Sequence, residues 1–381
     1  MSSFFSRLSS STYEAIFRRL ANHRPPQQRP IELKANSRIL CFTCAGIGDT
    51  LTDSVVFRAL RETYPDAHLA GVVHRRRREL LEHNPFVNQI FLFHKGPVAF
   101  WQLLNELRYN GPWDAILHLR GNDPEPRCLS YLVDPDVTVS VTNMTKLGWL
   151  CGHQFEQPDW DTTHGVEQTL RIAWYVGADT QRPHLVYRVQ QVEVDRLEEK
   201  LRQMMISSNR PRLVIQIGGG RRAAWRDWPV ERYAQLLRLI AANNMDAEIF
   251  LLGGEDLLPR REELDSHFPG EQKPYHDMVG HLTLPESAAL LATARTVVST
   301  DTGIMHLAFA VGARVVAIIH CNNPESRVGP YGYGQRHRVV QLPRPANYHS
   351  PADANMGDIP AQTVYLKLRE IWDAGARRTE D

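Results

Sequence analysis

The sequence predicts an α/β protein built from two domains. Short apolar runs alternate with helical patterns from residue 38 onward, and the same alternation starts again at residue 213. A chain of 381 residues is long for one domain, and two domains of roughly 150 to 200 residues each are the usual solution. We expect an N-terminal extension (1–37), a first domain (38–182), a second domain (183–345) and a C-terminal segment (346–381).

The composition excludes several classes of protein. The sequence holds 44 Lys and Arg against 43 Asp and Glu, which does not indicate a nucleic-acid-binding protein. It contains neither an apolar run long enough to span a membrane nor a signal-peptide core, which favours a cytoplasmic protein. The five cysteines are scattered, so Cys41 and Cys44 are expected to be buried free thiols rather than a redox pair or metal half-site.

Residues 1–37 predict a basic amphipathic helix followed by a Pro/Gln-rich linker. Apolar side chains such as Tyr13 and Phe17 are interspersed with arginines in this stretch. Two roles stay open for the helix. It rests on an anionic membrane surface, as in a peripheral enzyme that acts on a lipid-linked substrate, or it docks on the protein.

The first strand is predicted at 38–43, and Gly46-Ile47-Gly48-Asp49 then leads into a helix. A Gly-x-Gly turn is shared with dinucleotide-binding folds, but Leu51 replaces the third small residue and no carboxylate follows the next strand, 69–73. Arginines 75 to 78 follow that strand instead, which fits a 2′-phosphate or a basic surface. Asp49 lies at the carboxyl end of a strand, where a working carboxylate is expected.

The rest of the first half continues the alternation. The expected elements are strands at 89–93, 115–119 and 137–141, helices at 98–108 and 164–176, and a loop over 143–160. Because parallel strands bring their carboxyl ends to one edge, Asp49, Arg75 and Arg120 should face a common cleft, where arginines suit an acidic partner or form a solvated rim. Asp134-Pro-Asp136 and Asp159-Trp-Asp161 match a short metal-binding pattern, but neither clearly follows a strand, so no required metal is predicted.

The second half opens with a strand at 213–217 and a Gly218-Gly219-Gly220 turn whose N–H groups can wrap phosphate. Arg226 precedes a helix at 230–243 and should point into the same crevice. A strand at 249–252 runs into Gly253-Gly254-Glu255, where a carboxylate can accept hydrogen bonds from both hydroxyls of a ribose. The remaining helices are expected at 194–205, 285–294 and 361–372, the last crossing back to the first domain.

The stretch 296–319 is the most informative part of this half. It predicts a strand (296–299), a turn, a helix (304–311) and a second strand (314–319). The turn carries Asp301, Thr302 and Gly303 to the start of the helix, whose free N–H groups and positive dipole predict a phosphate ligand, with His306 as a further donor. The plain alternative is that Asp301 or Thr302 only caps the helix.

Together these motifs resemble glycosyltransferase family 9, the bacterial heptosyltransferases. The similar stretches occur in the family's order at 46–49, 226–229, 254–255, 299–308 and 323–330. The resemblance implies a GT-B architecture, with two Rossmann-like α/β/α domains facing across a cleft. It also implies an inverting transfer of a heptose from ADP-heptose, or a similar nucleotide-sugar, to a lipopolysaccharide-core or other cell-surface glycan acceptor.

The resemblance further implies roles for single residues. Asp49 would be the general base, and Arg226, where the family more often has Lys, would offset charge on the departing diphosphate. The ribose and adenine would be held by Glu255 and Leu282. The residues expected at the donor diphosphate are Gly218, Gly219, Asp301, Thr302, Gly303 and His306. Those expected at the acceptor are Gly48, Arg75 and Arg120, and no cofactor is required.

Some features depart from the family pattern. The proline usual in the first helix is replaced by Val55-Val56, and glycines 218 to 220 replace a Ser/Thr loop, which leaves the acceptor open. Two rival functions are considered. In an NADP-dependent oxidoreductase, Gly46-Ile47-Gly48 and Arg75 would hold the cofactor, but the glycine pattern is incomplete. A non-catalytic nucleotide-sugar-binding paralogue is disfavoured by the retention of Asp49 and Arg226.

Overall fold

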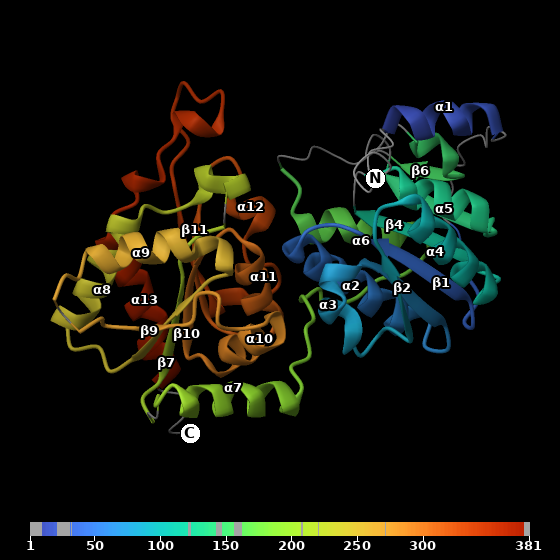
Figure 1. The fold of residues 1–381 in the computed structure, drawn as a ribbon. Coiled ribbons are helices and arrows are strands. Elements are labelled where there is room, and N and C mark those ends of the chain that lie inside the picture. Colours follow the sequence, from blue (N-terminus) through green and yellow to red (C-terminus); the bar gives the residue numbers. More distant parts are fainter. Residues whose placement is uncertain are drawn as a thin grey trace. The chain divides into compact units, whose positions relative to one another are not determined.

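The computed structural model describes residues 10–20, 31, 33–120, 123–141, 147–155, 162–206, 209–219, 221–270 and 272–376. The chain forms two compact units, Met1–Val186 and Tyr187–Asp381, and each carries the predicted alternation of strands and helices (Figure 1). The boundary between the units lies between Val186 and Tyr187.

The first unit is built on a six-stranded sheet in the order β3-β2-β1-β4-β5-β6, and every neighbouring pair is parallel. Its strands are β1 (Arg38–Thr43), β2 (His68–His74), β3 (Gln89–Phe93), β4 (Ala115–Arg120), β5 (Val137–Val141) and β6 (His153–Phe155). Its helices are α1 (Ser10–Leu20), α2 (Ile47–Thr63), α3 (Glu79–Glu82), α4 (Pro97–Tyr109), α5 (Glu125–Val133) and α6 (Gly165–Tyr175). Helices α2 and α6 pack on one face of the sheet, and α4 and α5 on the other (Figure 1).

The second unit repeats this plan with a six-stranded parallel sheet in the order β12-β11-β10-β7-β8-β9. Its strands are β7 (Arg212–Gln216), β8 (Glu248–Leu252), β9 (His276–Asp277), β10 (Thr296–Thr300), β11 (Val315–Ile319) and β12 (Arg338–Gln341). Its helices are α7 (Gln191–Gln203), α8 (Val230–Ala242), α9 (Leu258–Ser266), α10 (Leu284–Thr293), α11 (Gly303–Ala310), α12 (Glu325–Val328) and α13 (Ala361–Ala376). Counted from its own first strand, each sheet has the Rossmann order 3-2-1-4-5-6.

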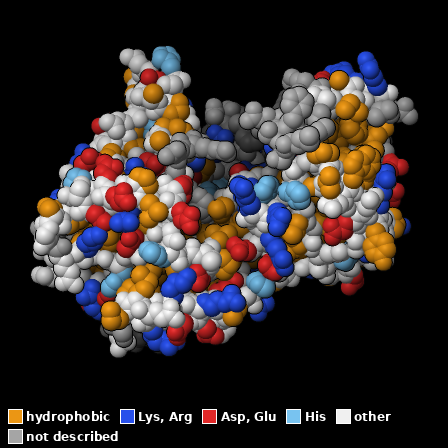
Figure 2. Space-filling model, in the orientation of Figure 1, with side chains coloured by type: hydrophobic (Ala, Val, Ile, Leu, Met, Phe, Trp, Pro, Cys, Tyr) orange, Lys and Arg blue, Asp and Glu red, His pale blue; other side chains and the backbone are white. Residues whose placement is uncertain are grey.

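The central strands explain why the sequence reads as apolar runs. All five residues of β10 and of β11 are buried, and so are residues 39–43 of β1. Parallel strands covered by helices on both faces lose the usual alternation of polar and apolar residues. Cys41 and Cys44 are buried free thiols, as predicted. On the visible surface, acidic and basic side chains are interspersed, in keeping with the balanced composition (Figure 2).

Elements with a weak apolar pattern escaped the sequence analysis. Strand β6 and the short 3₁₀ turn Gly148–Leu150 lie inside the stretch 143–160 that was expected to be a loop. Helix α9 is mostly polar and fully buries only Leu264, so it shows little helical periodicity. Helix α5 and strand β12 were also missed.

The N-terminal helix α1 docks on the first unit. Tyr13 and Phe17 are 8% and 6% exposed and belong to the hydrophobic core that includes Phe100 of α4. The Tyr13 hydroxyl donates a hydrogen bond to Glu125 at 2.7 Å. The apolar face of α1 therefore docks on the protein. The predicted linker at 25–28 lies outside the described residues.

The last helix, α13, does not follow the prediction that it crosses to the first domain. It packs on α8 and on strands β10 to β12 of the second unit. Val364, Leu368, Ile371 and Trp372 belong to the hydrophobic core of that unit. The apolar stripe of α13 was visible in the sequence, but a stripe does not specify which sheet it covers.

Replacing Leu368 by Ala tests this packing. Leu368 is fully buried, so the truncation is expected to lower the free energy of unfolding by about 2 to 5 kcal/mol, measured by urea denaturation. Leu366, two residues earlier and 53% exposed, is the matched control, and its truncation should change the free energy by less than about 0.5 kcal/mol. Equal losses for the two variants would contradict the placement of α13.

Candidate active site

The candidate residues gather where each sheet reverses its strand order. In the first unit, Asp49 follows β1 and Arg120 ends β4, the neighbouring strand. In the second unit, Gly218 follows β7, and Asp301 follows its neighbour β10. In an open parallel sheet, helices leave in opposite directions at this point and leave a crevice at the carboxyl ends of the strands. The predicted residues therefore lie at the switch point of both sheets.

The carboxylate of Asp49 is held by hydrogen bonds but remains accessible to a ligand. It lies in the first turn of α2, where its Oδ2 accepts a hydrogen bond from the Gly46 N–H at 3.3 Å. Its Oδ1 accepts from Nη1 of Arg120 at 3.1 Å. The side chain is nevertheless 49% exposed, so the carboxylate can meet a ligand. Gly48 precedes Asp49 in the same turn.

Asp53 lies one turn further along α2 and was missed by the sequence analysis. Its side chain is completely buried, and Arg120 Nε lies 3.2 Å from its Oδ1. The hydroxyl of Thr43 donates to Oδ2 at 2.6 Å, and that of Thr169 donates to Oδ1 at 3.3 Å. Burial raises the pKa of Asp53 to about 7, although Arg120 and the two hydroxyls favour the charged form.

The sequence did carry a signal for Asp53. Residues four apart on a helix lie on the same face, so Asp53 had to share the face of Asp49. It also stands next to Val55 and Val56, in a helix that buries most of its residues. A carboxylate in such surroundings needs a cationic partner. Arg120 is that partner.

Of the arginine run, Arg77 acts on Asp49 rather than the predicted Arg75. Residues Arg75–Arg77 form a 3₁₀ turn after β2, in which Arg75 is exposed and Arg77 is half-buried. Burial lowers the pKa of Arg77, and the nearby charge of Asp49 opposes this shift. Arg78 pairs with Glu82 at 2.6 Å within its own helix.

Asp301 organises the switch point of the second unit. Its side chain is 3% exposed, and its Oδ2 accepts from Arg226 Nη1 at 2.8 Å and from Asn323 Nδ2 at 3.0 Å. His306 Nε2 lies 3.7 Å from Oδ1. Burial alone would raise the pKa of Asp301, but His306, Arg226 and Asn323 together hold it well below the ordinary value. Asp301 is therefore a fixed anion that orients three donors.

Two polar atoms beside Asp301 lack hydrogen-bond partners in the described part of the chain. Thr302 is the N-cap of α11, yet its side chain makes no capping bond, and its Oγ1 is buried and unpaired. Arg226 Nε is also buried and unpaired. The alternative that Thr302 serves only as a side-chain cap does not fit this geometry. With the first N–H groups of α11, the two atoms form a site suited to an anion.

In the glycine turn after β7, Gly218 and Gly219 allow a ligand to approach the backbone closely. Gly218 has φ +139°, a conformation that favours glycine. The Gly219 N–H already donates to Asp227 Oδ1 at 2.7 Å. Contrary to the prediction, it is therefore not available to bind phosphate. A Cβ atom on Gly219 would lie 3.1 Å from Thr302 Cγ2. The bare backbone of Gly219 therefore borders the Thr302 site.

Glu255 and Leu282 lie on the adjoining part of the same sheet edge. Glu255 is exposed in the 3₁₀ turn Glu255–Leu257, which follows β8, the strand next to β7. The loop that leads to Leu282 passes against this turn, because a Cβ atom on Gly280 would lie 3.4 Å from Glu255 Cγ. Leu282 is half-buried.

An aromatic side chain that the sequence analysis did not assign also borders the site. The guanidinium of Arg226 lies over the ring of Trp225, 5.3 Å from its centroid. Trp225 in turn meets the buried ring of His320 edge-on, with centroids 4.9 Å apart. Arg226 is thus held between the indole ring and the carboxylate of Asp301.

Comparison with known proteins decides the family. The model of glycosyltransferase family 9 (heptosyltransferase) matches residues 128–353, which is more than half of the chain. The chain belongs to glycosyltransferase family 9. It is therefore a glycosyltransferase. A family relative, lipopolysaccharide heptosyltransferase 2 of Salmonella typhimurium, is 23% identical over 359 residues, covering 88% of this chain and 98% of the relative.

Solved structures agree on the fold of this family 9 enzyme. A glycosyl transferase family 9 protein from Veillonella parvula has a TM-score of 0.75 at 16% identity, covering 90% of this chain and 99% of that one. The ADP-heptose LPS heptosyltransferase II of E. coli has a TM-score of 0.73 at 20% identity, covering 88% and 98%. These likenesses support the predicted GT-B fold with two Rossmann-like domains.

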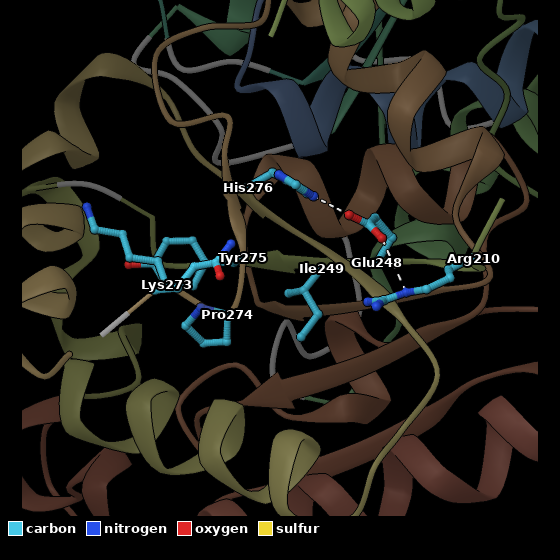
Figure 3. Close-up of a pocket in the computed structure, with 8 residues that line it drawn as sticks. Arg210, Glu248, Ile249, Lys273, Pro274, Tyr275 and His276 are labelled. Atoms are coloured by element: carbon cyan, nitrogen blue, oxygen red, sulfur yellow. Dashed lines mark hydrogen bonds and ion pairs between the residues drawn. The ribbon is translucent and has the colours of Figure 1, made fainter. Parts of the chain in front are cut away.

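A separate hollow of roughly 570 Å³ lies in the second unit, at β8 and β9 (Figure 3). Glu248 and His276, the first residues of these two strands, line it, so it lies at the amino ends of the strands. Figure 3 shows His276 and Arg210 both directed at the Glu248 carboxylate, which forms an ion pair with Arg210 and a hydrogen bond with His276. This hollow is therefore distinct from the carboxyl-end cluster around Asp301.

The described residues contain no group of three or more His, Cys, Asp or Glu side chains arranged to hold a metal ion. Asp134 ends α5 in a left-handed conformation, and residues 159–161 lie outside the described part of the chain. The expectation that no metal is required stays a prediction.

No described helix is long and apolar enough to cross a membrane.

The raised pKa of Asp53 predicts a pH-dependent stability. A carboxyl whose pKa is higher in the folded state stabilises the fold below its unfolded pKa and loses that contribution as the pH rises through the folded pKa, here about 7. Relative to Asp53→Asn, the wild type should lose about 2 to 3 kcal/mol of unfolding free energy between pH 5 and 8. Denaturant titrations at several pH values measure the difference.

The matched control is Asp66→Asn, an exposed aspartate just after α2. The free-energy difference between this variant and the wild type should vary much less with pH. A flat difference for Asp53→Asn as well would mean that Asp53 remains ionised throughout this range.

Proposed function

We propose that this enzyme transfers a heptose from ADP-heptose, or a similar nucleotide-sugar, to a hydroxyl group of a lipopolysaccharide-core or other cell-surface glycan. The observation that carries the proposal is Asp49, a half-exposed carboxylate at the first switch point that Arg120 holds in place. The names of the Salmonella and E. coli proteins give the sugar, the donor and the acceptor class. Membership of the same family is the reason to carry them to this chain.

Asp49 acts as the general base. Its carboxylate takes the proton of the acceptor hydroxyl as that oxygen bonds to the anomeric carbon of the heptose. The bond from this carbon to the diphosphate oxygen breaks on the opposite face, so the configuration inverts and ADP leaves with the electron pair. Positioned proton transfer of this kind contributes roughly 10²- to 10⁴-fold to a rate.

The donor diphosphate occupies the cluster around Asp301. The unpaired Thr302 Oγ1 and Arg226 Nε donate to it, together with the first N–H groups of α11. His306 adds a donor, and Gly218, Gly219 and Gly303 leave room for the phosphates. The buried Asp301 orients Arg226 rather than touching the diphosphate, since two anions would repel each other.

This arrangement supplies the charge that departure of the diphosphate requires. Negative charge grows on the leaving oxygens, where the Arg226 guanidinium and the positive end of α11 stabilise it. A bound metal ion serves the same purpose in other enzymes, so we propose that this reaction requires none. Glu255 binds the ribose hydroxyls, and Leu282 packs against the adenine.

The acceptor binds on the first unit. Arg120 and Arg77 lie beside the base, and with Gly48 and the exposed Arg75 they favour a phosphorylated or otherwise acidic glycan. A lipid-linked acceptor would bring the enzyme to the cytoplasmic face of the inner membrane. Arg19 is exposed on α1 and is available to anionic lipid headgroups there.

The first test of this function is Asp49→Asn. With ADP-heptose and lipopolysaccharide-core fragments, the variant should transfer heptose at least about 100-fold more slowly than the wild type, because the acceptor proton has no base. Its stabilisation by ADP in a thermal-shift measurement should be unchanged. Normal turnover in this variant would show that Asp49 is not the base.

A nucleotide panel tests the donor. ADP at about 100 times its Kd should stabilise the enzyme by close to 2.7 kcal/mol, and UDP, GDP and NADPH at the same concentration should stabilise it less. A preference for UDP or GDP would mean that the donor carries a different nucleotide, with the mechanism unchanged. Binding of NADPH alone would instead favour the NADP-dependent oxidoreductase. Measurable transfer excludes a non-catalytic paralogue.

Thr302→Val tests the diphosphate site. Removing a hydroxyl that bonds a charged ligand should weaken ADP binding by roughly 10- to 100-fold in calorimetry. Thr293→Val, at an exposed position on α10, is the matched control and should leave the affinity unchanged. The same affinity in both variants would place the diphosphate elsewhere.

A further inference from the structure

The proposed transfer leaves the buried Asp53 without a task. Arg120 joins it to the base, because Nε of the guanidinium lies 3.2 Å from Asp53 Oδ1 and Nη1 lies 3.1 Å from Asp49 Oδ1. One arginine therefore bridges two carboxylates, one exposed to the ligand and one sealed behind it. The exposed one is a reacting group, so the sealed one can influence the reaction only through charge or position.

We propose that Asp53 is a positioning residue that offsets the charge of Arg120 and thereby preserves the ability of Asp49 to accept a proton. This inference rests on the proposed function, because it requires that Asp49 is the base. Asp53 itself does not touch the substrate. It changes how strongly the Arg120 guanidinium competes with the acceptor proton for the Asp49 carboxylate.

The surroundings of Asp49 show why such an offset is needed. Two cations face it, Arg120 from β4 and Arg77 from the turn after β2, and the Gly46 N–H adds a hydrogen bond from its own helix. All three groups compete with the acceptor proton for this carboxylate. An ionised Asp53 removes part of this effect, since its charge acts on Arg120 at short range.

The groups around Asp53 point to Arg120 as its target. Thr43 of β1 and Thr169 of α6 donate hydroxyl hydrogen bonds to it, and the buried thiols of Cys41 and Cys44 lie within its electrostatic influence. Arg120 and Asp49 are the charged side chains that act on it. The charge of Asp53 is therefore paired with Arg120.

A purely structural role does not require a carboxylate at position 53. The two threonine hydroxyls can hydrogen-bond a neutral amide, and a neutral side chain would avoid the cost of burying a charge. Arg120 would stay in place without Asp53, because its Nε and Nη2 also donate to Thr169 Oγ1 at 3.0 and 2.9 Å. What Asn cannot supply at this position is the negative charge.

The pH dependence of transfer should reveal this charge. Because burial raises the pKa of Asp53 to about 7, the offsetting charge appears as the pH rises through neutrality. The wild-type kcat should therefore rise across this range. Asp53→Asn should remove the rise and lower kcat at pH 8 by roughly 3- to 10-fold, with the KM for the donor unchanged.

The decisive experiment is a double-mutant cycle with Arg120→Met. The kcat values of the wild type, Asp53→Asn, Arg120→Met and the double variant are measured between pH 5.5 and 9 with saturating donor. If Asp53 works through Arg120, Asp53→Asn has no further effect in the Arg120→Met background. The inference would be overturned if the fold-changes in kcat of the two single variants multiply in the double variant. It would also be overturned if Asp53→Asn keeps the wild-type pH profile of kcat.

Two further variants keep the outcomes distinct. Near-normal turnover in Asp49→Asn would refute the proposal that Asp49 is the base. If Asp49→Asn is inactive but Asp53→Asn keeps the wild-type pH profile of kcat, only the role of Asp53 is refuted. Thr43→Val serves if Asp53→Asn does not fold. It removes a hydrogen bond that favours the ionised form, so the rise in kcat should move to higher pH, and an unmoved rise counts against the inference.

Discussion

Both switch points depend on a buried aspartate paired with an arginine. Asp53 is completely buried and Asp301 is 3% exposed, and they lie 3.2 and 2.8 Å from Arg120 and Arg226. An unpaired buried charge is so unfavourable that removing one partner typically costs about 3 to 5 kcal/mol. Asp301 therefore holds the Arg226 guanidinium in place, whereas Arg120 is held beside Asp53 by Thr169 as well.

The two pairs differ in how completely the carboxylate is satisfied. Asp301 interacts with Arg226, Asn323 and His306, which holds its pKa well below the ordinary value and keeps it charged at any working pH. Asp53 interacts with one arginine and two hydroxyls, which lower its pKa less than burial raises it. The same pairing therefore produces a permanent anchor in the second unit and a group that titrates near neutrality in the first.

The sequence predicted what local patterns encode. Strands at 89–93 and 137–141 coincide with β3 and β5, because their apolar runs are bounded by clear turn signals. Asp49 and Arg226 were singled out because short motifs follow β1 and precede α8. Asp53 was not singled out, since its partner Arg120 lies 67 residues further along the chain and comes close through sheet pairing. The packing of α13 was missed for the same reason, as its apolar stripe fits either sheet.

The unpaired atoms at the start of α11 follow from the same logic. A buried hydrogen-bonding group without a partner costs about 1 to 3 kcal/mol, and both Thr302 Oγ1 and Arg226 Nε are in this state. If these groups bonded to each other or to the backbone, a ligand would first have to break those bonds. Asp301 and Trp225 hold the Arg226 guanidinium, and in the proposed reaction such preorganisation would stabilise the charge that develops on the leaving group.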